Sequence, residues 1–279
     1  MSVPHRLRVL AGPTVTWVLA LGVLWLIRLR TGVAWYIDFH TWLDQRGVPG
    51  WVRNLDSDAI VLVAVVLIWW GRCRFDPGPK RPILTDLGLL GGRGWIVRGL
   101  GVGVLFALPM LLFAIVFALI RGAMPTMSWS MISGVIVAPF NEEIFYRGLL
   151  VFALWRVRGV GFWPLAIVGA LLFGSAHISW TAAGIADGWG VVLVTGAGGL
   201  WFAWLAREWA THLGKPGMGN IWVPMALHGL MNLSWAFMAA GENAVGGLWP
   251  NVARGLTIVC SVLVTRRYAT RTGRDRLIT

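Results

Sequence analysis

The chain has 279 residues, of which 57% are hydrophobic and only 13% are charged, and its mean hydropathy is +0.70. Soluble globular proteins contain about 25% charged residues, so this composition excludes an ordinary soluble domain and indicates an integral membrane protein. The net charge is +12, but the basic residues lie between apolar runs, which favours orientation in a lipid bilayer and argues against binding of nucleic acid. Two distant cysteines, Cys73 and Cys260, form neither a disulfide framework nor a zinc motif.

Eight apolar segments approach the length of about 20 residues that a membrane-spanning helix needs. The first, near residues 9–27, follows a basic start as a signal peptide does, but its long apolar run and missing cleavage site favour a spanning helix. The others lie near residues 58–71, 99–120, 130–155, 161–180, 190–206, 222–240 and 250–265. The second and the last are short and need residues from their flanks. We predict an all-α polytopic membrane protein, a single integral membrane domain over residues 1–279, with about eight transmembrane helices around an intramembrane polar cavity.

The distribution of basic residues gives this topology an orientation. With eight spans, 17 Lys and Arg residues fall on the side of the two termini and 5 on the opposite side. Cytoplasmic loops carry the positive excess in membrane proteins, so both termini are predicted to be cytoplasmic. Two glycine clusters, GLGVG at 99–103 and GAGG at 196–199, are expected to let neighbouring helices approach closely.

The stretch NEEIFYRG at 141–148 places charges inside an apolar segment. A charge at the centre of a spanning helix costs about 2.5–3.5 kcal/mol on insertion scales, so each of these side chains needs a partner. Glu143 and Arg147 are four residues apart with the acid first, which favours an ion pair on one helix face. Glu142 lies about 100° around the helix from Glu143, and it has no basic residue one turn away. Glu142 is therefore free for another role.

Two further spans carry polar residues at helical spacing. Phe173 and His177 lie one turn apart in FGSAH, and His228 and Asn232 lie one turn apart in HGLMN. A single intramembrane histidine is most simply a structural hydrogen-bonding residue. Together with Glu142, however, they bring a carboxylate, two imidazoles and an amide onto three otherwise apolar helices.

These groups suit the hydrolysis of a peptide bond inside a membrane cavity. A carboxylate can act as a general base for water and then as an acid for the leaving group. One imidazole can hold the water, while the other imidazole and the amide donate hydrogen bonds to the developing oxyanion. Pro139 is expected to kink the helix just before Glu142.

At these residues the sequence resembles the CPBP family of CaaX proteases and bacteriocin-processing enzymes, also called the Abi family, which includes the Ras-converting CaaX endopeptidase of the endoplasmic reticulum. The family pattern is EExxxR, FxxxH and HxxxN on successive transmembrane helices. All three motifs are present in order, at 142–147, 173–177 and 228–232. They cover about residues 130–240, and the rest of the chain is assigned by hydropathy alone. The resemblance implies an eight-helix intramembrane endopeptidase.

The resemblance also implies roles for the catalytic candidates. Glu142 activates the water, and His177 helps to position it. His228 and Asn232 form the oxyanion hole.

Three further residues are implied to support the site. Glu143 and Arg147 hold it in place, and Phe173 forms a cavity wall beside His177. Two histidines and a carboxylate could also bind zinc, but HExxH is absent and an asparagine suits an oxyanion donor better than a metal ligand. We therefore expect no metal and no other cofactor, with zinc as the alternative.

The leading hypothesis is thus an intramembrane endopeptidase that cuts a membrane-associated protein or peptide in the lipid bilayer. Prenylated CaaX proteins are one substrate option and non-prenylated peptides or membrane proteins are another, and the oligomeric state is left open. The alternative is a catalytically silent membrane scaffold or bacteriocin-immunity protein of the same fold, although a scaffold has no chemical need for all four catalytic candidates. A transporter that relays protons through Glu142 is a third reading, but the inverted repeats typical of many transporters are not visible.

Overall fold

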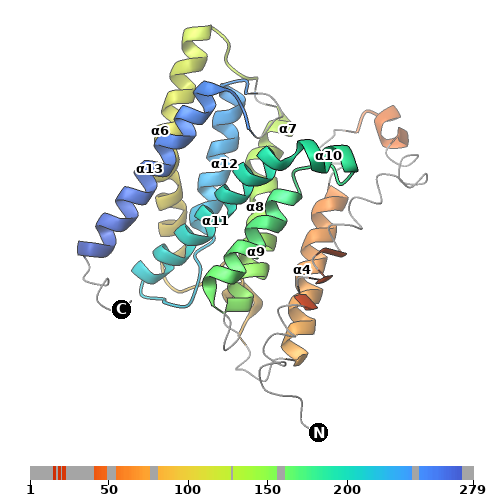
Figure 1. Ribbon diagram of the computed structural model, residues 1–279, viewed down its shortest axis with the longest axis vertical. Helices are drawn as coiled ribbons and strands as arrows, with labels where there is room; N and C mark the ends of the chain where they lie inside the picture. The colour runs from red at the N-terminus through yellow and green to blue at the C-terminus, as the bar shows by residue number, and fades with distance from the viewer. Residues whose placement is uncertain are drawn as a thin grey trace.

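The computed structural model describes residues 15–16, 18–19, 21–22, 41–48, 55–75, 81–126, 128–155, 161–240 and 245–271. In these residues the regular structure is helical, with no β-strand, which confirms the all-α prediction. The elements in chain order are α4 (Leu55–Phe75), α5 (Ile83–Asp86), α6 (Trp95–Arg121), α7 (Trp129–Ile132), the π-helix η1 (Ser133–Val137), α8 (Ala138–Glu142), the π-helix η2 (Glu143–Ala153), α9 (Phe162–Ser175), α10 (Ala182–Asp187), α11 (Trp189–His212), α12 (Trp222–Phe237) and α13 (Leu248–Arg271). Successive long helices cross the molecule in alternating directions (Figure 1).

The helices agree with the predicted spans in place but not always in length. Three of them are long and apolar enough to cross a membrane, namely α6, α11 and the part of α13 from Leu248 to Ala269. The predicted span 58–71 lengthens into α4 at both ends, as expected of a segment that needed its flanks. The predicted spans 161–180 and 222–240 are shorter, because α9 has 14 residues and α12 has 16. The predicted first span, 9–27, lies mostly outside the described residues, and the count of eight spans stays a prediction.

The predicted span 130–155 forms the centre of the bundle. Every residue of η2 is buried, as expected of a helix that has other helices on all sides. Its apolar side chains form the main core with residues of α4, α9, α11 and α12. Glu143, the acidic residue at the start of η2, is therefore held in the interior by the packing of the whole bundle.

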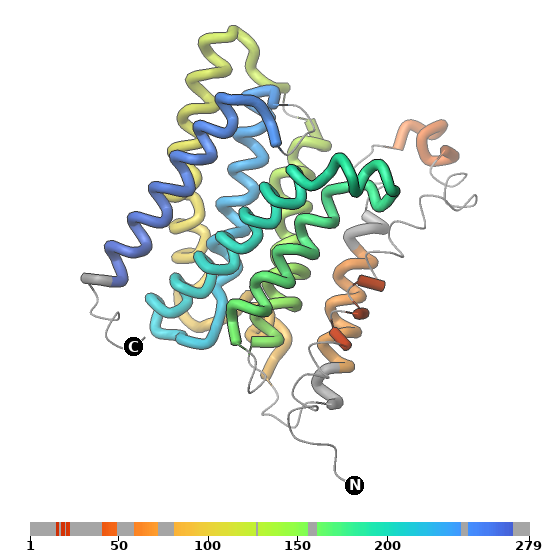
Figure 2. The backbone as a smooth tube through the Cα atoms, in the orientation of Figure 1, coloured from red at the N-terminus to blue at the C-terminus, as the bar shows by residue number. Residues whose placement is uncertain are grey.

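Glycines stand where helices approach closely, as the glycine clusters predicted. α6 lies beside α12 (Figure 2), and a Cβ on Gly103 would collide with the backbone of Val223 and Leu227. On α11, a Cβ on Gly199 would lie 3.1 Å from the Arg147 guanidinium and 3.2 Å from the Phe173 ring. Helices in a bilayer associate through such close packing, and here it brings α11 against the charged part of η2.

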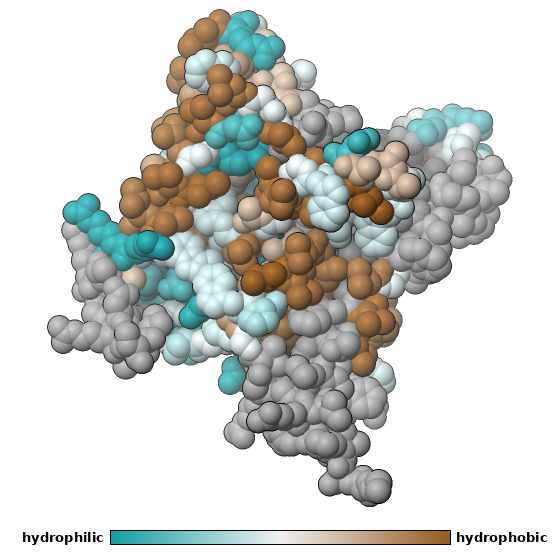
Figure 3. Space-filling model, viewed as in Figure 1, coloured by the Kyte–Doolittle hydropathy of each residue, from teal (hydrophilic) through white to brown (hydrophobic). Residues whose placement is uncertain are grey.

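Apolar side chains cover much of the outer surface, as Figure 3 shows over α6 and α13. Exposed residues on these two helices include Leu105, Leu112, Val116, Leu119, Val259 and Leu263. An apolar exterior of this extent suits contact with lipid. The structure therefore supports an integral membrane protein.

Candidate active site

The two glutamates lie where the helix geometry changes. α8 ends at Glu142, η2 begins at Glu143, and η1 ends just before α8. Pro139 lies in the first turn of α8 and has no backbone N–H. It therefore cannot donate to the carbonyl four residues before it, as in an α-helix, or to the carbonyl five residues before it, as in a π-helix. The sequence predicted a kink at Pro139, and the structure shows a change of helix type around it.

Glu143 and Arg147 form the ion pair that their spacing predicted. Glu143 Oε1 lies 3.0 Å from a terminal nitrogen of Arg147, and the two side chains are 0% and 2% exposed. The guanidinium also lies over the ring of Phe173, 4.1 Å from its centroid, where a cation is attracted to the aromatic face. Glu143 Oε2 has no hydrogen-bond partner among the described residues. Such a desolvated pair is stable only while both members remain.

His228 joins the two glutamates, which the sequence did not predict. Its Nδ1 donates a hydrogen bond of 3.0 Å to Glu143 Oε1, since a carboxylate only accepts. Its Nε2 lies 3.6 Å from Glu142 Oε2, slightly too far for a direct hydrogen bond. Glu142 is 31% exposed and His228 is 12% exposed. The partly exposed carboxylate of Glu142 therefore faces Nε2 of the ring, while the buried carboxylate of Glu143 holds the ring through Nδ1.

Phe173 connects His177 to this group. The Phe173 ring centroid is 4.6 Å from that of His177 and 6.2 Å from that of His228, so its predicted position beside His177 is observed. His177 is exposed, in the turn after α9, and its Nδ1 donates to the carbonyl of Phe173 at 2.8 Å. A neutral ring bonded in this way presents Nε2 as a hydrogen-bond acceptor. Between His177 and the glutamates the structure shows no direct polar contact in the part of the chain it describes.

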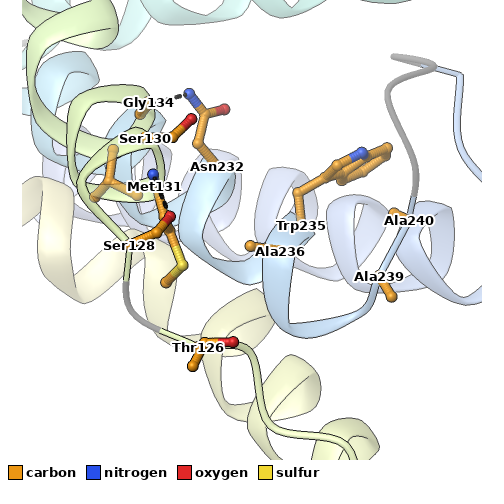
Figure 4. A pocket seen from close by; sticks show the side chains of 11 residues that line it. Thr126, Ser128, Ser130, Met131, Gly134, Asn232, Trp235, Ala236, Ala239 and Ala240 are labelled. Carbon is orange, nitrogen blue, oxygen red and sulfur yellow. Dashed lines mark hydrogen bonds between the residues drawn. The ribbon is translucent and has the colours of Figure 1, made fainter. Parts of the chain in front are cut away.

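Asn232 lies one turn from His228 on α12, nearer the pocket shown in Figure 4. Its amide nitrogen donates to the carbonyl of Gly134 at 2.9 Å, as the dashed line in Figure 4 marks. That carbonyl is five residues before Pro139, so it is one of the two that proline leaves without a helical donor. The amide has a second N–H, which this bond leaves available.

Phe202 of α11 also belongs to the site, although the sequence did not single it out. Its ring centroid is 5.4 Å from that of His228 and 5.3 Å from the Arg147 guanidinium carbon. The sequence could have indicated Phe202 only through its position three residues after Gly199, because residues at this spacing share a helix face. That indication was weak, because the predicted span 190–206 carries no polar motif.

The arrangement does not form a metal site among the described residues, where no three His, Cys, Asp or Glu side chains are grouped to hold an ion. His228 directs one nitrogen to each glutamate, and the Nδ1 of His177 is bonded to a backbone carbonyl. The zinc alternative stays open, because neither His177 Nε2 nor His228 Nε2 makes a direct hydrogen bond among the described residues. Metal-independent chemistry stays a prediction.

Comparison with known proteins shows which family the residues of this site resemble. Residues 124–234 match the family model described as Type II CAAX prenyl endopeptidase Rce1-like. The match includes all three motifs and the pocket residues of α7 and η1. No curated protein and no solved structure gives a significant match to the chain.

Proposed function

Through residues 124–234 the chain belongs to the Rce1-like family of type II CAAX prenyl endopeptidases, and on this premise we propose that it is a glutamate-dependent intramembrane endopeptidase. The observation that carries the proposal is the position of His228, with Nε2 3.6 Å from the accessible Glu142 and Nδ1 3.0 Å from the buried Glu143. A histidine with a purely structural role needs neither a partly exposed carboxylate near Nε2 nor a buried carboxylate bonded to Nδ1. The match to a protease family favours this reading over a silent scaffold.

In the proposed reaction, Glu142 takes a proton from a water molecule as the water oxygen attacks the carbonyl carbon of the scissile peptide bond. His177 accepts a hydrogen bond from this water through Nε2, the nitrogen that its bond to Phe173 leaves available. Glu142 is the suitable base because it is 31% exposed and has no cation within ion-pairing distance among the described residues apart from His228. Glu143 is committed to Arg147.

The oxyanion of the tetrahedral intermediate then needs donors, and Asn232 supplies its second amide N–H. His228 supplies Nε2–H when the ring is protonated on both nitrogens, since Nδ1–H is already bonded to Glu143. The developing oxyanion balances that positive charge, since the Glu143 carboxylate is already paired with Arg147. The C–N bond breaks as Glu142 returns its proton to the amine, which regenerates the carboxylate and leaves a new carboxyl end and a new amino end. Removing one oxyanion donor typically lowers kcat by about 10²–10³.

The proposal is tested by replacing Glu142 with glutamine, which keeps the shape and removes the base. Cells that make the wild-type protein or Glu142→Gln are compared by mass spectrometry of their membrane peptides, and the peptide that accumulates uncleaved is then assayed with purified protein. Glu208→Gln is the matched control, since Glu208 is a partly exposed acid beside Arg207 near the end of α11. We expect cleavage to be lost in Glu142→Gln and kept in the control. Full activity of Glu142→Gln would refute the mechanism.

A further inference from the structure

α6 and α13 separate towards the end of the bundle where α6 begins and α13 finishes (Figure 1). Near the middle of both helices they are joined, because the Met110 N–H donates a hydrogen bond of 3.1 Å to Thr257 Oγ1. Two turns further along α13 the contact is with α11 instead, where Trp209 Nε1 donates to Thr265 Oγ1 at 3.0 Å. α13 therefore turns from α6 to α11, and α11 forms the floor of the gap between the other two helices.

A pocket of about 400 Å³ lies in this gap. Its lining includes Arg98, Val102 and Leu105 of α6, Trp209 of α11 and Tyr268 of α13. Arg98 is in the first turn of α6, Trp209 is in the last turn of α11, and Tyr268 is next to the last residue of the apolar part of α13. Tryptophan and tyrosine gather at the headgroup level of a bilayer. The pocket therefore lies where three apolar helices reach the surface of the membrane.

Arg98 gives the pocket a positive charge. Its side chain runs back towards the start of α6, with Nε 3.3 Å from the place that a Cβ on Gly94 would take. No carboxylate of the described residues lies within ion-pairing distance of this guanidinium, and none lines the pocket. The exposed Arg93 and Lys215 add to the positive charge at this end. A guanidinium binds a phosphate group through paired N–H donors, so the outer part of the pocket suits a phosphate.

The inner part of the pocket is apolar and continues into the bilayer. Val102 and Leu105 follow Arg98 by one and two turns on the same face of α6, and Leu105 is 54% exposed. Leu112, which is 58% exposed, extends this face beyond the pocket. Gly101 widens the pocket, because a Cβ there would meet nothing within 4 Å. A free phosphate would leave this apolar surface uncovered, whereas the acyl chain of a phospholipid would cover it.

We propose that this pocket binds an anionic phospholipid, with the phosphate at Arg98 and an acyl chain along Val102 and Leu105. The lipid fills the gap that α13 leaves as it turns from α6 to α11. Basic pockets between spanning helices are typical sites for anionic lipid headgroups. The proposal does not depend on the proposed function, because none of the lining residues belongs to the candidate active site.

The headgroup is tested by native mass spectrometry of the purified full-length protein in detergent, with dioleoyl phosphatidylglycerol or dioleoyl phosphatidylcholine added. The two lipids have the same chains, but only the first has a net negative charge, so we expect it to bind more tightly. Arg98→Gln should weaken its binding about tenfold through loss of a charge-assisted hydrogen bond.

Arg93→Gln is the matched control, since it removes the same charge from an exposed residue at the same end that does not line the pocket. Its affinity for phosphatidylglycerol should stay close to that of the wild type. Equal affinity of the wild type for the two lipids, or an equal loss of affinity in the two variants, would show only a general attraction to the basic end and would overturn the proposal.

The acyl chain is tested by Gly101→Leu, which fills the pocket without changing its charge. Gly255→Leu is the matched control, because a Cβ there also has open space but Gly255 does not line the pocket. Both variants should unfold no lower than the wild type in lipid-free detergent. A lipid that binds the folded protein raises its Tm, so phosphatidylglycerol should raise the Tm of the wild type and of Gly255→Leu but not of Gly101→Leu. An undiminished lipid effect in Gly101→Leu, or an equal rise with inorganic phosphate alone, would overturn the proposal.

Discussion

Removing either member of the Glu143–Arg147 pair tests how the site is held in place. Breaking a buried ion pair by removing one partner typically costs about 3–5 kcal/mol, because the other charge stays buried without compensation. The pair is suited to this test because its side chains are only 0% and 2% exposed. Glu143→Gln leaves Arg147 without a charged partner among the described residues, whereas Arg147→Met leaves Glu143 with its hydrogen bond to His228.

We therefore expect both single variants to be destabilised, with Glu143→Gln nearer the upper end of that range. Chains of about 150–250 residues lose roughly 2–4 °C of Tm for each kcal/mol, so the expected fall is on the order of 10 °C. The double variant, Glu143→Gln with Arg147→Met, should be more stable than the sum of the single losses predicts, since no unpaired charge remains.

The assay is thermal unfolding of the purified protein in one detergent, with Glu208→Gln as the control. Glu208 lies 3.8 Å from Arg207, and both side chains are partly exposed, so its loss should cost no more than about 1 kcal/mol. Single variants that unfold at the wild-type temperature, or strictly additive losses in the double variant, would refute the assignment of this pair as a coupled support of the site.

Four other substitutions, of which Gly198→Ala is the control for Gly199→Ala, test three separate parts of the structure. Asn232→Ala should lower kcat by about 10²–10³ with a smaller change in KM if the amide is an oxyanion donor, and a change confined to Tm would show that only its bond to Gly134 matters. Gly199→Ala should cost about 1–3 kcal/mol by overpacking, since its Cβ would lie 3.1 Å from Arg147. Gly198→Ala, with open space at the same helix, should gain up to about 1 kcal/mol, and equal Tm shifts would contradict this packing. Pro139→Ala restores an N–H that competes with Asn232 for the Gly134 carbonyl, so peptidase activity should fall without loss of Tm, and unchanged activity would argue against a role for the altered helix geometry.

The sequence predicted where the helices lie along the chain, but not where each helix ends or how the helices pack against one another. The apolar runs located the helices, because a run of about 20 apolar residues is stable as a helix in a bilayer. Their ends depended on local turns, and α9 ends at Ser175 where the sequence predicted helix to residue 180. The π-helical segments were not predicted, since they follow from how Pro139 and the surrounding helices share backbone hydrogen bonds.

The sequence by itself determined the contacts that depend on one helical turn. Glu143 meets Arg147 because residues four apart share a helix face, and Phe173 meets His177 for the same reason. The tertiary structure alone decided that His228 would lie between the two glutamates, and that the Asn232 amide would bond a carbonyl 98 residues away. Helical spacing specifies which side chains share a face but not which helix that face meets. That choice depends on packing across the whole bundle, where glycines such as Gly103 and Gly199 decide how closely the helices approach.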